Sequence, residues 1–162
     1  MIQRIQTLFI IGISALMMIT IFVPFWQSEA IEKTTGISGQ AHLDPIAIHF
    51  IAHSQASMEN KGDTYYLAAL AMLASLTAMF AMFQYRNRKL QTKLCLFNYL
   101  ILIGLEGSYF IAIDKAKAMF EISNISFSTG FFLPLVAIIF NFFALRYIKK
   151  DDDLIKSVDR IR

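Results

Sequence analysis

The chain has 162 residues, of which 56% are hydrophobic, 14% aromatic and 17% charged. With 15 Phe and 8 Met beside 7 Gly and 3 Pro, this composition excludes collagen-like, low-complexity and disordered chains, and the length suits one domain. The formal net charge is +3, but the charged residues are distributed so unevenly that their positions are more informative than their sum.

Four segments of 20 to 24 residues are almost free of charge, and together they contain a single Asp, Glu, Lys or Arg, which is Glu106. About 20 apolar residues suffice for a helix to cross a hydrocarbon core, and lipid requires every backbone polar group to be bonded within the segment. The sequence therefore predicts an all-α membrane protein, a bundle of four transmembrane helices forming one membrane domain over residues 1–150. The predicted spans cover about residues 5–26, 64–85, 94–113 and 125–147.

The basic residues indicate which way the predicted bundle faces. Arg4, the loop over residues 84–93 and the residues after 145 together hold 11 of the 15 Lys and Arg. The positive-inside rule then places both termini and this loop in the cytoplasm. The expected surroundings are the lipid bilayer, and no basic surface with interleaved aromatic residues predicts a nucleic-acid partner.

The first apolar segment has a second interpretation as a signal peptide. Arg4 supplies a basic start, and Ser28-Glu29-Ala30 has the small-x-small pattern of a cleavage site. The uncharged run is longer than the usual core of 7–15 residues, however, and it ends in Pro24-Phe25-Trp26, which resembles an aromatic anchor at a membrane surface. We therefore favour a retained span.

The predicted outer side contains a 37-residue loop over residues 27–63. Two β-favouring runs, Thr34–Ile37 and Ile46–Ala52, predict a small hairpin there. A short helix over Pro45–His53, with Asp44 as its N-cap, is the alternative. The second outer connection, Asp114–Glu121, is expected to extend the third helix by about two turns.

The residues after 150 predict a short amphipathic cytoplasmic helix. Three acidic residues begin it and basic residues end it, which complements the helix dipole. Such a helix either lies on the inner leaflet or docks a protein partner. The residues expected to make these contacts are Leu154, Lys156, Val158, Arg160, Ile161 and Arg162.

Glu106 is the strongest candidate for an intramembrane site. A charged group deep in the bilayer is costly, so its carboxyl is expected to face the bundle interior, where Thr20 lies at similar depth. Gly104 and Gly107 flank it and are expected to let another backbone approach. The carboxyl either binds a proton or cation during transport or, when protonated, hydrogen-bonds a neighbouring helix; the second role is favoured because no further acid accompanies it.

Two other sets of residues are expected to hold the helices together. Asn98 and Asn141 lie at similar depth on the third and fourth spans and predict an interhelical amide bond. Small residues spaced three and four apart on the second span predict close helix packing, within this bundle or against another protein. This stripe includes Ala71, Ala74, Ser75 and Ala78.

Signals for catalysis are weak. Cys95 is the only cysteine, which excludes relays through cysteine pairs. His42, His49 and His53 lie on the predicted outer loop, and His49 and His53 could share one face as metal ligands. No acidic residue stands between them to act as a base, so ordinary loop histidines are the better interpretation. We expect no metal, no cofactor and no enzymatic activity.

Three cytoplasmic motifs carry a resemblance to a known family. They are Met1-Ile2-Gln3-Arg4-Ile5-Gln6-Thr7-Leu8, then Asn87-Arg88-Lys89-Leu90-Gln91 leading to Cys95, and the closing run from Lys149 to Arg162. Together they resemble an uncharacterised membrane-protein family of Bacteroidota, domain of unknown function 4293, over the whole chain. The resemblance implies a four-span protein of the bacterial inner membrane and implies no activity.

Two functional hypotheses follow from these features. The first is a non-enzymatic scaffold or accessory subunit that binds other membrane or cytoplasmic proteins, as the packing stripe and the specific tail suggest. The second is a small proton- or cation-coupled transporter that uses Glu106. The long outer loop is unusual for small four-span exporters, and it favours the first hypothesis.

Overall fold

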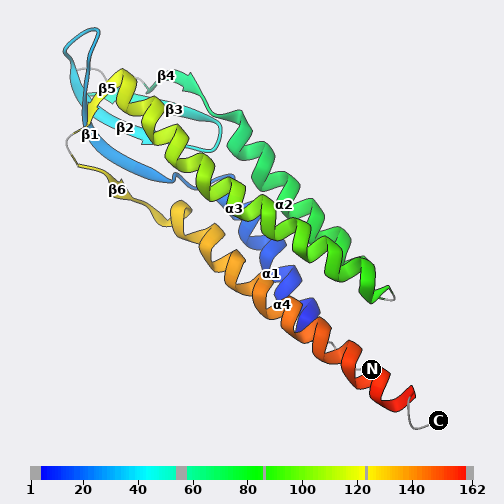
Figure 1. Ribbon diagram of the computed structural model, residues 1–162. Coiled ribbons are helices and arrows are strands. Elements are labelled where there is room, and N and C mark those ends of the chain that lie inside the picture. The colour runs from blue at the N-terminus through cyan, green and yellow to red at the C-terminus, as the bar shows by residue number, and fades with distance from the viewer. Residues whose placement is uncertain (1–4, 54–57, 86, 123, 160–162) are drawn as a thin grey trace.

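The computed structural model describes residues 5–53, 58–85, 87–122 and 124–159. Within them the chain forms four helices, which run side by side as a long bundle, and a β-sheet at one end of that bundle (Figure 1). The start of α1 and the end of α4 lie at the other end (Figure 1). The elements in chain order are α1 (Ile5–Thr20), β1 (Trp26–Glu32), β2 (Ser38–Leu43), β3 (Ala47–Ala52), β4 (Met58–Asp63), α2 (Tyr65–Phe83), α3 (Arg88–Met119), β5 (Phe120–Ile122), β6 (Ser126–Phe127) and α4 (Thr129–Asp159).

The predicted all-α fold is wrong, because the sheet is a second structural layer. Its strands are antiparallel in the order β4-β3-β2-β1-β5, and β6 also pairs with β1. The predicted outer loop supplies four of the six strands, and the connection between α3 and α4 supplies the other two. Three of the strands escaped prediction because β4 has the composition of a loop, Met-Glu-Asn-Lys-Gly-Asp, and because β5 and β6 are only 3 and 2 residues long.

The structure can be compared with both predictions for the outer loop, the hairpin and the short helix. Ala47–Ala52 forms β3, so the helical alternative over Pro45–His53 is wrong. The run Thr34–Ile37, in contrast, lies in the turn between β1 and β2, not in a strand. Gly36 has φ +69 in this turn, and its amide donates to the carbonyl of Glu32 at 2.8 Å. A positive φ is readily adopted by glycine and disfavours a strand at this point.

The sheet curls around an aromatic core. The rings of Phe50 on β3 and Phe120 on β5 stack with centroids 5.1 Å apart, although β2 and β1 separate their strands. Glu32 on β1 and Lys61 on β4 form an ion pair of 3.0 Å, although β2 and β3 lie between their strands. Such contacts require strong curvature, which buries one face of the sheet and exposes the other.

The ion pair of the curled sheet has shifted ionisation. The hydroxyl of Thr35 donates to the Glu32 carboxylate at 2.6 Å, and this bond, followed by Lys61, lowers the pKa of Glu32. Lys61 also contacts Glu59 at 2.5 Å. The hydrogen bond to Glu59, and then the one to Glu32, raises the pKa of Lys61. The charged forms of Glu32 and Lys61 are therefore those that the folded sheet stabilises.

The sheet is joined to α2 through the turn between β2 and β3. The Thr64 amide donates to the carbonyl of Ile46 at 2.9 Å, and its hydroxyl donates to the carbonyl of Asp44 at 2.9 Å. The amide of Ala68 donates to the carbonyl of Pro45 at 3.2 Å. The first amides of a helix lack partners inside it, and here the turn supplies them. The start of α2 is thus held in place by the sheet.

The first helix is shorter than the predicted span over 5–26. It ends at Thr20, and residues 21 and 22 form turns before Pro24. Proline disfavours a helical residue before it and has no amide to donate, which accounts for this end. Phe25 and Trp26 do not anchor a membrane surface, because both are fully buried and Trp26 begins β1.

Helix α2 is slightly shorter than the predicted span over 64–85, whereas α3 and α4 are longer than theirs. Helix α3 has 32 residues and runs to Met119, so it extends through most of the second outer connection. Its start is capped by Asn87, whose side chain accepts from the Leu90 amide at 3.2 Å. Residues 151–159, expected as a separate helix, continue α4 without a break.

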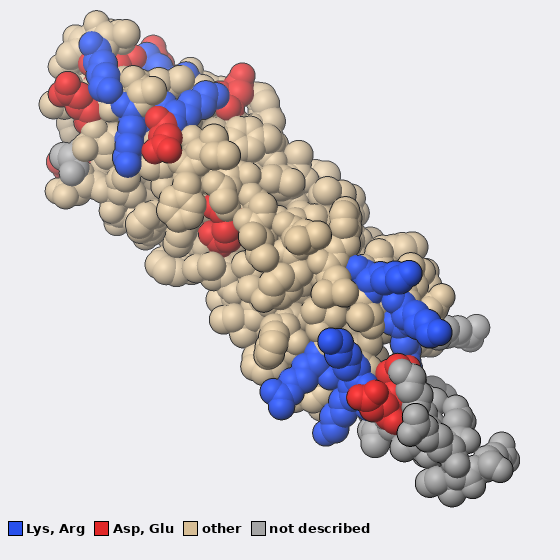
Figure 2. Space-filling model, viewed as in Figure 1, with Lys and Arg blue, Asp and Glu red and all other residues tan. Residues whose placement is uncertain are grey.

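Three helices, α2, α3 and α4 as far as Asp153, are long and apolar enough to cross a membrane, and α1 is a shorter apolar helix of 16 residues. Helix α1 packs against α2 and α4, and α3 packs against the same two neighbours. On the visible face, uncharged side chains cover most of the middle of the molecule, interrupted by a small acidic patch, while the other Lys, Arg, Asp and Glu gather at its two ends (Figure 2). These features are compatible with a membrane protein.

Candidate functional site

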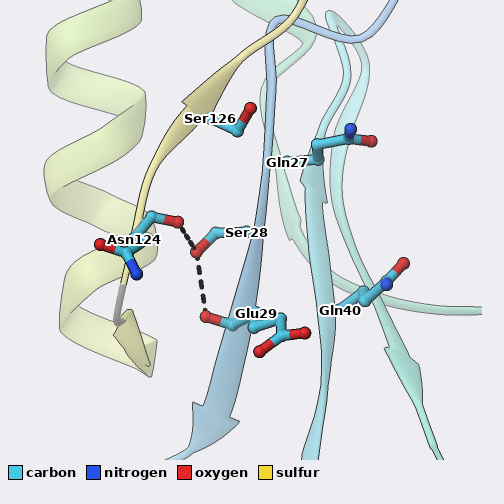
Figure 3. Close-up of a pocket in the computed structure, with 6 residues that line it drawn as sticks. All are labelled: Gln27, Ser28, Glu29, Gln40, Asn124 and Ser126. Atoms are coloured by element: carbon cyan, nitrogen blue, oxygen red, sulfur yellow. Dashed lines mark hydrogen bonds between the residues drawn. The ribbon is translucent and has the colours of Figure 1, made fainter.

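A polar cavity of about 310 Å³ opens at the sheet, and we call it the sheet cleft. Its lining residues come from β1, from β2 and from the segment that leads into β6 (Figure 3). Of these residues, only Ser28 is buried. The lining consists of Gln27, Ser28, Glu29, Gln40, Asn124 and Ser126.

The cleft forms because β1 changes partners along its length. It pairs with β6 at Trp26 and Gln27, and with β5 from Ala30 onward. Between these two ladders lie Ser28 and Glu29, where the neighbouring chain departs from β1. The Ser28 hydroxyl donates to the carbonyl of Glu29 at 2.9 Å and to the carbonyl of Asn124, which ties the two sides of the gap together (Figure 3).

The chemistry of the lining favours binding. It contains three carboxamides, two hydroxyls and one carboxylate, and none of the six residues is Lys, Arg or His. Carboxamides and hydroxyls can each donate and accept hydrogen bonds. Sequence reasoning missed the cleft because its residues converge only through strand pairing.

The three histidines lie on or beside β2 and β3. His42 and His49 are direct cross-strand partners, and Nε2 of His49 lies 3.4 Å from the carboxylate of Asp44. His53 follows β3 and, with Glu29 and Glu121, helps to line a smaller cavity of about 190 Å³. In the part of the chain that the structure describes, no three potential metal ligands cluster.

Glu106 lies half-buried on α3, and its Oε1 has no hydrogen-bond partner among the described residues. The hydroxyl of Tyr109, one turn along the same helix, is likewise buried without one. Thr20 does not contact the carboxyl through a hydrogen bond, since its hydroxyl donates to Leu16 of its own helix at 2.8 Å. Gly104 and Gly107 face open space, so the expected close approach of another backbone is not seen among the residues that the structure describes.

Asn98 and Asn141 are both buried, but they do not form the predicted amide–amide bond. The side-chain amide of Asn141 donates to the backbone carbonyl of Cys95 at 2.9 Å. The Oδ1 atoms of both residues have no partner within the described chain.

Two buried amides in the same half of the bundle, Gln6 and Gln91, were missed. The spacing of three and four residues from Gln91 through Cys95 to Asn98 could have placed Gln91 on this face.

The small-residue stripe of α2 lies inside the bundle. Ala71, Ala74, Ser75 and Ala78 are all buried. The Ser75 hydroxyl lies 3.0 Å from that of Ser14 on α1, and it also lies 3.1 Å from the Ser14 carbonyl. The stripe therefore packs against α1, within this bundle.

The end of the bundle away from the sheet is basic. The guanidinium of Arg88 donates to the backbone carbonyl of Asp151 at 2.6 Å, which joins the start of α3 to α4. For three of the predicted tail contacts, the structure describes only the backbone, which is helical: Leu154, Lys156 and Val158. The other three, Arg160, Ile161 and Arg162, lie outside the described residues. We call this end the basic end, defined by Arg88, Lys89, Lys93, Arg146, Lys149 and Lys150.

Comparison with known proteins finds one family. The model of a domain of unknown function, DUF4293, matches residues 2–161, nearly the whole chain. No curated protein matches the chain.

Proposed function

The chain belongs to the DUF4293 family of unknown function, and on that premise we propose that it is a non-enzymatic integral membrane protein, a scaffold or accessory subunit. In this proposal the bundle anchors the protein in a bacterial inner membrane and holds the sheet in the outer aqueous phase. The sheet cleft is then the surface that a partner contacts.

The membrane placement rests on where apolar and basic side chains lie along the bundle. Helices α2, α3 and α4 carry large apolar side chains on their outer faces, such as Leu76, Leu100 and Ile139, which are each more than half exposed in the isolated chain (54%, 68% and 53%). The basic end faces the cytoplasm by the positive-inside rule, which leaves the sheet outside. Ser28 and Ala30 of the cleavage-like pattern lie within β1, so cleavage there would cut a strand that has partners on both sides.

One observation carries the proposed function, namely a polar cleft on a rigidly held sheet. Three backbone and side-chain hydrogen bonds join the sheet to the start of α2, and Phe50 and Phe120 join it to the end of α3. A site on rigid elements loses little conformational entropy when it binds. The cleft lies outside the apolar part of the bundle, where a soluble ligand or the outer part of a membrane partner can reach it.

A quantitative pull-down from native membranes tests this proposal. The tagged full chain is expected to retain a partner in near-stoichiometric amount. A double substitution, Gln27→Ala with Gln40→Ala, should release that partner, whereas Gln84→Ala at the opposite end of the molecule should not. A chain that purifies alone, or a partner held equally by all three proteins, would reject the cleft as a partner site.

A second function, proton- or cation-coupled transport, is supported by Glu106 and Tyr109. Both carry oxygens without partners in the described structure, within one turn of α3. In proteoliposomes, a transporter would carry protons, Na⁺ or K⁺ down an imposed gradient, and Glu106→Gln would abolish that flux while Glu121→Gln at the sheet end would not. A wild-type flux equal to that of empty liposomes would reject this function.

A further inference from the structure

We infer that the sheet cleft binds a neutral, polyhydroxylated ligand, a mono- or disaccharide unit. This inference rests on the proposed function, because it specifies the chemistry of what the same cleft recognises. The ligand can be the terminal sugar of a partner's glycan or a free sugar, and both present the same hydroxyl groups.

The hydrogen-bonding groups of the cleft match vicinal hydroxyls. Each sugar hydroxyl is both a donor and an acceptor, and so it is best satisfied by groups that also do both. The carboxamides of Gln27, Gln40 and Asn124 offer an N–H₂ donor and a carbonyl acceptor side by side, and the hydroxyl of Ser126 does the same. The carboxylate of Glu29 adds acceptor capacity for a hydroxyl pair.

These groups line one cavity from neighbouring segments of the sheet. Ser126 and Asn124 stand on one side of β1, and Gln40 stands on β2 on the other side, with Gln27 and Glu29 between them on β1 (Figure 3). Residues 27 and 29 point to the same face of their strand because side chains alternate. Glu29 is the direct cross-strand partner of Gln40, so a carboxylate and a carboxamide lie next to each other.

Charge excludes several other ligand classes. The six lining residues include a carboxylate and no cation, so phosphates, nucleotides and carboxylate ligands would meet repulsion with no compensating ion pair. The lining also contains no aromatic or large aliphatic side chain, so an apolar ligand would leave the carboxamides without partners at considerable cost. A neutral polar ligand meets neither penalty.

The cavity size sets the length of the sugar. Its volume of about 310 Å³ is at the lower end of the usual range for small-molecule sites, about 300–1,000 Å³. One or two pyranose rings suit such a site, whereas a longer chain would extend beyond it. With no aromatic side chain in the lining to stack on the ring, binding is expected to be weak, with a Kd on the order of 1 mM.

Saturation-transfer difference NMR on the full chain tests the inference. The protein is purified in lauryldimethylamine oxide, because a detergent with a sugar headgroup would compete for the cleft. Glucose and N-acetylglucosamine are the probes, and we expect transfer to their ring protons. Gln40→Ala should weaken this binding about tenfold, the effect of losing one or two well-made hydrogen bonds. Gln84→Ala, the same substitution outside the cleft, should leave it unchanged.

The single tryptophan gives a second readout and a folding control. Trp26 is fully buried and immediately precedes Gln27, so its emission reports the fold of every variant and should respond to a sugar in the cleft. Ethanolamine is tested in parallel. Transfer to ethanolamine alone would overturn the inference in favour of a cationic ligand. If the protein is folded and neither sugar shows saturation transfer, the inference is wrong.

The outcomes distinguish this inference from the proposed function. If a partner still depends on Gln27 and Gln40 in the pull-down while both sugars are silent, the cleft recognises a protein surface, and only the sugar assignment is wrong. If the sugars bind while no partner is retained, the cleft is a small-molecule site and the scaffold proposal fails.

Discussion

The sheet end and the helical bundle differ in the side chains that they expose and in the polar side chains that they bury. At the sheet end the buried residues are mainly aromatic and aliphatic, while the exposed face is polar and lines the sheet cleft. In the bundle the outer face carries Phe, Leu, Ile and Met, while carboxamides lie inside. The buried aromatics of the sheet end are Phe25, Trp26, Phe50 and Phe120, and the buried carboxamides of the bundle are Gln6, Gln91, Asn98 and Asn141.

This contrast indicates that one chain is built for two solvents. In water, apolar burial stabilises a fold, and so the sheet encloses its aromatic residues. In lipid, the surroundings are as apolar as the helices, and association depends on close packing and interhelical polar contacts. The bundle has these features in the Ala and Ser stripe of α2 and in the bond from Asn141 to Cys95. The same residue type should therefore respond differently in the two regions. Two matched pairs of variants compare the regions directly, and two further pairs compare buried with exposed positions inside one region.

Phe120→Ala should have the largest effect. Phe120 is 1% exposed and stacks on Phe50, so its loss should reduce the free energy of unfolding by about 3–5 kcal/mol. Phe97→Ala on α3, where the ring is 53% exposed, should change it by about 0.5 kcal/mol or less. Unfolding by SDS titration, followed by Trp26 fluorescence, measures both. Equal losses would mean that the sheet core is not packed as described.

Ile103→Arg should strongly impair membrane insertion. Ile103 is half exposed near the middle of the predicted third span, where an Arg costs about 2.5–3.5 kcal/mol on insertion scales. Ile37→Arg, at a similarly exposed Ile of the sheet end, should be nearly neutral because its surroundings are water. Membrane flotation with quantitative immunoblotting compares the two. If both variants insert like the wild type, the bundle surface does not face lipid.

Ala71→Leu should disrupt packing between α1 and α2. Ala71 is fully buried, and inserting a larger side chain into such a position costs about 1–3 kcal/mol. Ala69→Leu provides the control, because Ala69 is exposed on the same helix. SDS resistance and thermal unfolding should separate the variants. A stable Ala71→Leu protein would show that the small residues are not required for close approach.

Acidification should have the smallest effect, and it should be confined to the sheet end. The pKa of Glu32 lies below its ordinary value of 4.5, because Thr35 and then Lys61 stabilise the carboxylate. A lowered folded-state pKa contributes stability above pH 4.5, and that contribution is lost as the pH falls below this value. The pKa of Lys61 is raised above 10.5, so its contribution persists through neutral pH and is lost only in strong alkali.

Glu32→Gln should remove about 0.2–1 kcal/mol of stability at pH 7 and reduce the loss below pH 4.5. Glu121→Gln, at an exposed carboxylate of β5, should keep the wild-type acid profile. Trp26 fluorescence as a function of pH, at fixed SDS, gives both profiles. An unchanged acid profile in Glu32→Gln would show that the ion pair to Lys61 does not stabilise the curled sheet.

The sequence could predict contacts between residues that are close together in the chain, but not contacts between residues that are far apart in it. The buried face of α2 follows from residues three and four apart on one helix, and so Ala71, Ala74 and Ala78, which are buried in the structure, could be placed on that face from the sequence. The cleft joins Gln27 and Gln40 to Asn124 and Ser126, which are more than 80 residues further along the chain. No local period connects them, and the cleft was therefore missed.

By itself, the sequence determined the apolar helices, the polar difference between the two ends and the family. These features depend on composition and helical periodicity within single segments, and both can be read from the sequence alone. Only the tertiary structure decided that 27–63 pairs with the connection between α3 and α4 to form a sheet, and that Phe25 and Trp26, which follow Pro24, lie in its core. It also decided that a cleft opens along β1 between its ladder with β6 and its ladder with β5. Strand pairing is a contact between distant residues, and short polar strands such as β4 acquire their conformation from their partners rather than from their own side chains.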